Sequence, residues 1–224
     1  MSAVLVVMLM ILVSGLPVLL GCWYFRAKHA MSRRFFFAAA LAGIAAVLLA
    51  AGAQLLVAPL APRPNLEAGT KWAILYAIFI EIASTEELAR FLTLMVCTGA
   101  LKKTLVAAPN KTALARATGM ISGFSFAAVE TIFFTMTNPD SGIIRAISAV
   151  PLHGACGIKA ANAVLSGKQS PGLSLLSIVF AIALHGIYNF LVQRGGLFPY
   201  LGIALAVTAL LSGAQSIRFE EADE

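Results

Sequence analysis

The side chains that could do chemistry in this sequence are acids and histidines placed inside long apolar runs. Four of the ten acids and two of the three histidines lie there: Glu81, Glu86, Glu87, Glu130, His153 and His185. An ionisable side chain at the centre of a bilayer costs about 3 kcal/mol or more, so each is a candidate functional residue. Their concentration in a chain with few charges is the strongest functional signal in the sequence.

Three of these residues are predicted to lie at one depth in the membrane. Counted from the same side of the membrane at about 1.5 Å per residue, Glu130, His153 and His185 lie about 12, 15 and 14 Å deep. One carboxylate and two imidazoles are a ligand set of catalytic zinc sites, which leave a fourth position for water. We therefore predict that these three residues bind Zn²⁺.

The pair Glu86-Glu87 supplies the carboxylate that a metal hydrolase needs to take a proton from water. Arg90 follows Glu86 by four residues, so helical spacing predicts that these two side chains pair. Asn189 follows His185 by four residues and is predicted to orient a ligand or to stabilise an oxyanion. Either acid of the pair could be the base, and either could instead complete the metal site.

The elements that position these residues are predicted from composition and hydropathy. Hydrophobic residues make up 60% of the 224 residues, charged residues make up 12%, and the mean hydropathy is +0.90. Because soluble domains carry about 25% charged residues, this composition excludes a soluble enzyme, a nucleic-acid-binding module and a disulfide-rich secreted domain. We predict an all-α, polytopic transmembrane bundle that forms a single domain over residues 1–224.

Seven runs are long enough to cross a bilayer, which takes about 20 helical residues. They lie near residues 3–24, 35–60, 71–101, 113–137, 143–165, 172–193 and 198–216. The third run would be about 46 Å long as a helix, too long for one upright crossing. It is therefore either strongly tilted or broken near Ser84-Thr85. The sequence predicts seven spans, or eight if this run divides.

Basic residues predict the orientation of these spans. Ten follow the odd-numbered runs: Arg26, Lys28, Arg33, Arg34, Lys102, Lys103, Lys111, Arg116, Lys168 and Arg218. Three lie at the opposite ends: Arg63, Lys71 and Arg194. By the positive-inside rule, the N-terminus is outside and the C-terminus is cytoplasmic. The net charge of +6 therefore indicates membrane topology, and no nucleic-acid partner is predicted.

Three short segments resemble the motifs of a known family: Glu86-Glu87-Leu88-Ala89-Arg90, Phe126-Ala127-Ala128-Val129-Glu130 and His185-Gly186-Ile187-Tyr188-Asn189. Together with Arg145 and His153, they are similar to the pattern of the PrsW-type intramembrane metalloproteases. These proteases share a superfamily with the CAAX prenyl proteases and bacterial immunity-associated homologues. The resemblance covers about residues 75–195.

The resemblance implies a CAAX-protease-like helical core that opens sideways to lipid and acts as a zinc-dependent endopeptidase. It implies membrane-tethered protein substrates, in some members an anti-sigma factor, and a bacterial inner-membrane location. The buried acids and histidines leave two other functions open: a proton- or cation-coupled transporter, and a catalytically silent scaffold that binds membrane partners, which ranks last because the ligand set is complete. Transporters of that kind often carry repeated halves, and the sequence shows no internal duplication.

Overall fold

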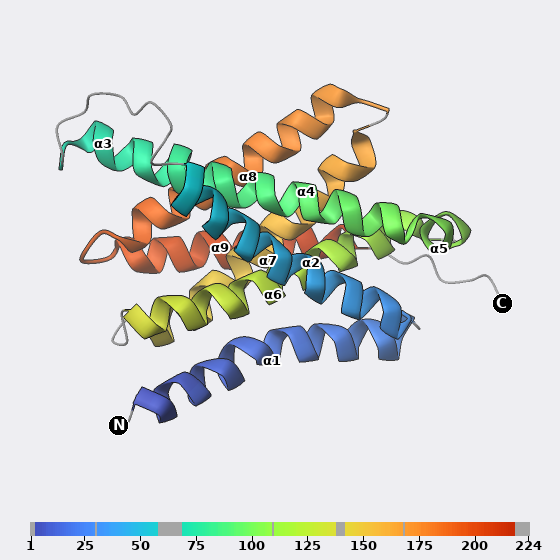
Figure 1. The fold of residues 1–224 in the computed structure, drawn as a ribbon, viewed down its shortest axis with the longest axis horizontal. Coiled ribbons are helices and arrows are strands. Elements are labelled where there is room, and N and C mark those ends of the chain that lie inside the picture. Colours follow the sequence, from blue (N-terminus) through green and yellow to red (C-terminus); the bar gives the residue numbers. More distant parts are fainter. Residues whose placement is uncertain are drawn as a thin grey trace.

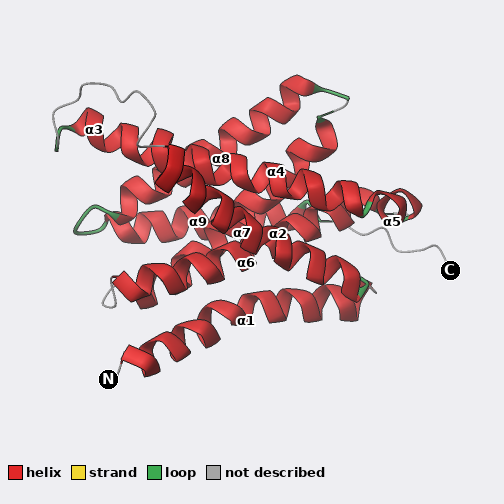
Figure 2. Ribbon diagram, viewed as in Figure 1, coloured by secondary structure: helices red, strands yellow, loops and turns green. Residues whose placement is uncertain are grey.

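The computed structural model is helical, and it describes residues 3–29, 31–57, 69–108, 110–137, 142–167 and 169–217. No strand forms among these residues, so the prediction of an all-α fold is confirmed (Figure 2). The helices are α1 (Ala3–His29), α2 (Arg33–Gly52), α3 (Lys71–Tyr76), α4 (Thr85–Ala100), α5 (Lys102–Ala107), α6 (Lys111–Thr137), α7 (Gly142–Ser166), α8 (Pro171–Val192) and α9 (Phe198–Gln215). Two π-helical segments, η1 (Ala53–Val57) and η2 (Ala77–Ser84), continue α2 and α3.

The helices make this an integral membrane protein. Within the described part of the chain, four are long and apolar enough to cross a bilayer: Arg33–Leu56, Lys111–Met136, Pro171–Val192 and Phe198–Gln215. Large apolar side chains such as Leu55 and Leu197 are exposed around the bundle, as a lipid-facing surface requires. The number of crossings, seven or eight, stays a prediction. Arg63, Lys168 and Arg218 lie outside the described residues.

The centre of the bundle is the contact between α6 and α7, the most extensive among the described helices. Glycines allow this close approach. A Cβ on Gly119 would overlap the carbonyl oxygen of Gly157, and a Cβ on Gly123 would overlap the carbonyl oxygen of His153. Small residues are typical of helix contacts in membranes because they let backbones pack closely. The packing therefore holds His153 directly against α6.

The other long helices surround this central pair (Figure 1). α1 and α2 pack on α6 around Phe35, Ile121 and Phe124, while α8 and α9 pack on α7 around Leu152 and Tyr188. α4 contacts α2, α7 and α8. Among the helices that carry the candidate residues, α4 and α7 thus each contact the other three, α4 contacting α6, α7 and α8, and α7 contacting α4, α6 and α8.

The third apolar run forms a continuous helix whose geometry changes where the sequence predicts a break. η2 ends at Ser84 and α4 begins at Thr85. The Ser84 hydroxyl donates to the carbonyl of Phe79 at 2.7 Å, and the Thr85 hydroxyl donates to the carbonyl of Glu81 at 2.6 Å. Gln54 of η1 donates its amide to the Thr85 hydroxyl at 3.0 Å. Side-chain hydrogen bonds therefore satisfy backbone around a π-helical segment, a feature often found at functional sites.

Candidate active site

Five ionisable side chains from α4, α7 and α8 come together inside the bundle. All are buried: Glu86, Glu87, Arg90, His153 and His185. α4 supplies the two acids and the arginine from its first two turns, directly after η2. Because lipid offers no hydrogen bonds, each of these groups must be balanced by protein or by a bound ligand.

Glu87 is the centre of the hydrogen-bond network in this cluster. Both of its carboxylate oxygens accept hydrogen bonds from Arg90, and Oε1 also accepts one from His185 Nδ1 at 2.7 Å. Because a carboxylate only accepts, Nδ1 of His185 carries the hydrogen in this contact. Neutral His185 then presents the lone pair of Nε2 to the cluster. Carboxylates orient metal-binding histidines in this way in many metal sites.

The predicted partner of Arg90 was Glu86, and the structure pairs Arg90 with Glu87 instead. Residues three and four apart are both neighbours on a helix, so spacing did not decide between them. Glu86 is turned toward His185, with its Oε2 atom 3.6 Å from Nε2. Both atoms are buried and have no hydrogen-bond partner among the described residues.

His153 is held on both of its ring nitrogens. Nδ1 accepts a hydrogen bond from Arg90 Nη2 at 2.8 Å, and Nε2 lies 2.8 Å from Oε2 of Glu130. Phe126 packs beside both groups: the Arg90 guanidinium lies 4.3 Å from its ring centroid and the His153 ring lies 4.7 Å from it. The aromatic ring one turn before Glu130 therefore positions the imidazole and the guanidinium together.

Glu130 lies at the edge of the cluster. Its carboxylate bridges His153 and Arg145, and it is 18% exposed. The Arg145 guanidinium also stacks over the ring of Phe134, 4.5 Å from its centroid. This carboxylate is thus engaged by α7 through both a histidine and an arginine.

The geometry of the cluster fits a bound metal ion. One ligand atom each from Glu86, His153 and His185 lies within 4.8 Å of the other two, and all three residues are buried. Two of these residues also carry a buried atom without a hydrogen-bond partner among the described residues, Oε2 of Glu86 and Nε2 of His185. A carboxylate and two imidazoles are donors that suit zinc. Glu130, the predicted third ligand, is not in this group of three.

Asn189 is buried on α8, one turn beyond His185. Among the described residues, its side chain forms no hydrogen bond to the cluster, so its role stays a prediction. The sequence predicted no role for Phe126, Gln54 or Tyr188. The Tyr188 hydroxyl lies 2.5 Å from the Ser148 hydroxyl. For Phe126 a signal existed, because an aromatic residue four positions before a buried acid shares its helix face.

The fold and this cluster define an integral membrane protein with a buried centre that is suited to metal binding and acid–base chemistry. The chain belongs to the PrsW family of intramembrane metalloproteases, whose family model matches residues 31–212. Membership indicates a membrane protease, a hydrolase of peptide bonds, and it confirms the resemblance seen in the motifs. No curated protein and no solved structure matches the chain.

Proposed function

We propose that this protein is an intramembrane zinc-dependent endopeptidase that cleaves membrane-tethered proteins. The observation that carries the proposal is the pair of unpartnered buried atoms, Glu86 Oε2 and His185 Nε2, which face each other beside His153. A carboxylate and an imidazole buried without hydrogen bonds are costly unless a bound ligand satisfies them. Family membership supports peptide hydrolysis as the reaction.

In this proposal Glu86, His153 and His185 would hold the zinc ion. The ion, when bound, supplies a polarised water and positive charge for the oxyanion. Glu87 keeps His185 in the tautomer that presents Nε2, and Arg90 holds both Glu87 and His153 in place. Ligation by His153 requires one of its two hydrogen bonds to be released.

The carboxylate that takes the proton of the attacking water is Glu130 in this proposal. Its Oε2 atom lies 2.8 Å from Nε2 of His153, and the positive charge of the neighbouring Arg145 offsets its negative charge. The sequence suggested the reverse division of labour, with Glu130 as a ligand and Glu86 or its neighbour as the base. Asn189 would donate its amide hydrogens to the oxyanion.

Zinc content and cleavage of a co-expressed membrane-tethered reporter test this division. We expect Glu86→Gln and His185→Ala to lose both zinc and cleavage. Glu130→Gln should retain zinc while its cleavage rate falls about 10²- to 10⁴-fold, the usual contribution of a general base. Lys103→Gln, a change in an exposed side chain of α5, is the control and should match the wild type.

Three outcomes would contradict the proposal. Loss of zinc from Glu130→Gln, with zinc retained by Glu86→Gln, would show that Glu130 is the metal ligand and that Glu86 or its neighbour is the base. Unchanged cleavage in both Glu86→Gln and His185→Ala would show that the cluster takes no part in catalysis. Proton-dependent flux in liposomes by a zinc-free wild type would favour the transporter alternative.

The proposed location is a bacterial inner membrane, with the N-terminus outside and the C-terminus in the cytoplasm. The orientation is supported by the excess of basic residues after the odd-numbered apolar runs. The bacterial inner membrane is what the resemblance to the PrsW-type proteases implies. The proposed substrates are membrane-tethered proteins, and an anti-sigma-factor-like regulator is one such substrate.

A further inference from the structure

A basic cavity lies at the end of α4 away from Glu86, where α4 and α5 meet α6, α7 and α8. Its volume is about 710 Å³. The cations Lys102, Lys111 and Arg116 line it, together with the polar side chains of Asn162 and Ser166. Among the described residues that line the cavity, none is acidic. The lining is therefore complementary to an anion.

Arg116 is held at the wall of this cavity by two hydrogen bonds. Its Nε donates to Oδ1 of Asn162 at 2.8 Å, and its Nη1 donates to the carbonyl of Ser216 at 2.7 Å. These contacts use two of the five N–H donors of a guanidinium, so the remaining donors are oriented before any ligand binds. Lys102 and Lys111 are exposed and free to turn toward the same space.

A second cavity of about 660 Å³ adjoins the first, and Thr98, Lys102 and Val164 line both. This second cavity extends between α4 and α8, away from the charged residues. Its walls there are apolar side chains: Phe91, Met95, Leu175 and Ile178. A basic cavity that continues into an apolar one has the charge and polarity pattern of a phospholipid, with an anionic head and a hydrocarbon chain.

We propose that these two cavities bind one anionic glycerophospholipid. The phosphate of its headgroup lies among Lys102, Lys111 and Arg116, and one acyl chain fills the apolar cavity between α4 and α8. Basic pockets between transmembrane helices on the cytoplasmic side commonly bind anionic headgroups. Because the acyl chain contacts both α4 and α8, the lipid connects the helices that carry Glu86 and His185. This binding does not depend on the proposed protease function.

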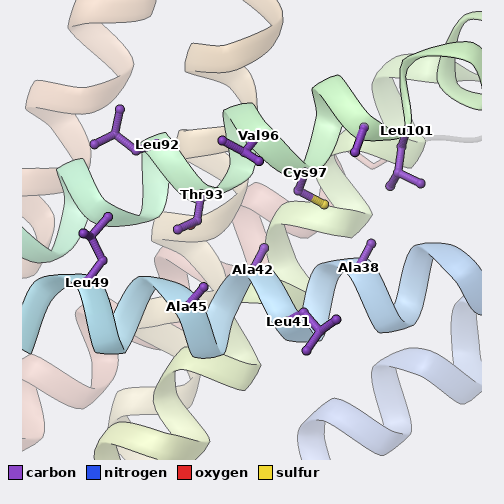
Figure 3. Close-up of a pocket in the computed structure, with 11 residues that line it drawn as sticks. Ala38, Leu41, Ala42, Ala45, Leu49, Leu92, Thr93, Val96, Cys97 and Leu101 are labelled. Carbon is purple, nitrogen blue, oxygen red and sulfur yellow. The ribbon is translucent and has the colours of Figure 1, made fainter.

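Another groove of the bundle lacks this pattern. It lies between α2 and α4, has a volume of about 390 Å³ and is lined by side chains such as Leu41, Ala45, Val96 and Cys97 (Figure 3). The hydroxyl of Thr93 is among its few polar groups, and none of the described residues that line it is charged. With no group to select a ligand, this groove carries no comparable inference.

Binding of defined lipids to the purified full-length chain in a neutral detergent tests the headgroup site. Native mass spectrometry would compare phosphatidylglycerol with phosphatidylcholine of the same acyl chains, and we expect at least tenfold tighter binding of phosphatidylglycerol. Each lysine near an anionic headgroup contributes roughly a factor of five, so the double variant Lys102→Gln/Lys111→Gln should bind phosphatidylglycerol about 10- to 30-fold more weakly. Lys103→Gln, on the same short helix but outside the cavity, should change binding less than about twofold.

The apolar part of the site is tested by Gly99→Leu. Gly99 lines the apolar cavity, and a Cβ there would meet nothing within 4 Å, so the larger side chain can enter the cavity without disturbing the fold. We expect this variant to weaken phosphatidylglycerol binding severalfold and to leave binding of soluble glycerophosphate unchanged. Gly15→Leu on α1, where a Cβ is equally free, is the matched control. Melting temperatures of all variants check that they fold.

Four results would overturn the proposal. Equal affinity of the wild type for phosphatidylglycerol and phosphatidylcholine would show that the site does not select an anionic headgroup, whatever the variants do. Undiminished binding by the double lysine variant would move the lipid elsewhere. Glycerophosphate bound as tightly as phosphatidylglycerol, or no effect of Gly99→Leu, would make this a site for a soluble phosphate.

Discussion

Two groups of basic side chains in this protein differ in what surrounds them. In the candidate active site, Arg90 is 0% exposed and pairs with Glu87, which is 1% exposed. At the other end of α4, Lys102 and Lys111 are exposed and Arg116 is half-buried. No acidic side chain among the described residues lines the cavity of this second group. The same residue types are thus balanced inside the protein in one region and open to an external anion in the other.

The difference shows how burial decides what a charge can do in a membrane protein. A buried cation has no water to stabilise it, so its partner carboxylate is part of the structure, and neither can be removed alone. An exposed cation at a helix end keeps its hydration and is free to bind a lipid headgroup. Substitutions at Glu87, Arg145 and Arg116 test how the effect changes from the buried interior of the protein to its surface.

The largest effect is expected for Glu87→Gln, which leaves Arg90 buried without its counter-charge. Breaking a fully buried ion pair costs about 3–5 kcal/mol, so we expect the free energy of unfolding to fall by about this amount. His185 also loses the carboxylate that fixes its tautomer, and zinc affinity should fall about 10- to 100-fold. Equilibrium unfolding in mixed micelles and zinc titration measure the two effects. A variant as stable as the wild type would show that buried Arg90 does not need the charge of Glu87 to compensate its own.

Much of the site could be predicted because ionisable residues are rare in apolar helices. Glu86, Glu87, His153 and His185 all stood out on that criterion, and the structure brings them together. The apolar runs likewise predicted the long helices, since hydropathy and length are properties of local sequence.

Which carboxylate joins the two histidines could not be predicted, because it depends on how each helix is rotated. The π-helical segment η2 precedes Glu86 and changes the number of residues per turn, so helical spacing from earlier residues does not give the direction of its side chain. The choice of Glu87 over Glu86 by Arg90 depends on the position of His185 on another helix. Contacts between helices are long-range, and spacing within one helix does not encode them.

An intermediate effect is expected for Arg145→Gln, which removes the cation beside Glu130 at the edge of the cluster. The side chains of Arg145 and Glu130 are 15% and 18% exposed, so this ion pair is intermediate between a fully buried ion pair and a surface ion pair. Surface pairs contribute about 0–1 kcal/mol and fully buried ones cost 3–5 kcal/mol to break, so we expect a loss of about 1–2 kcal/mol in stability. Cleavage should fall about tenfold because Glu130 loses its orientation, while zinc content stays unchanged. A loss as large as that of Glu87→Gln would contradict the gradient, and Lys103→Gln again serves as the control.

The smallest effect is expected for Arg116→Lys at the cavity end of the bundle. Lysine keeps the charge but loses the fixed geometry that donates to Asn162 and to the Ser216 carbonyl. Because the site is half-buried and open to solvent, we expect a loss of about 1 kcal/mol in stability and no change in zinc content or cleavage rate. Unfolding measurements and the reporter assay test the two parts separately. A strong loss of cleavage in this variant would mean that the two basic regions are coupled through α6 and α7, and the contrast between an internally balanced site and an open cationic end would then fail.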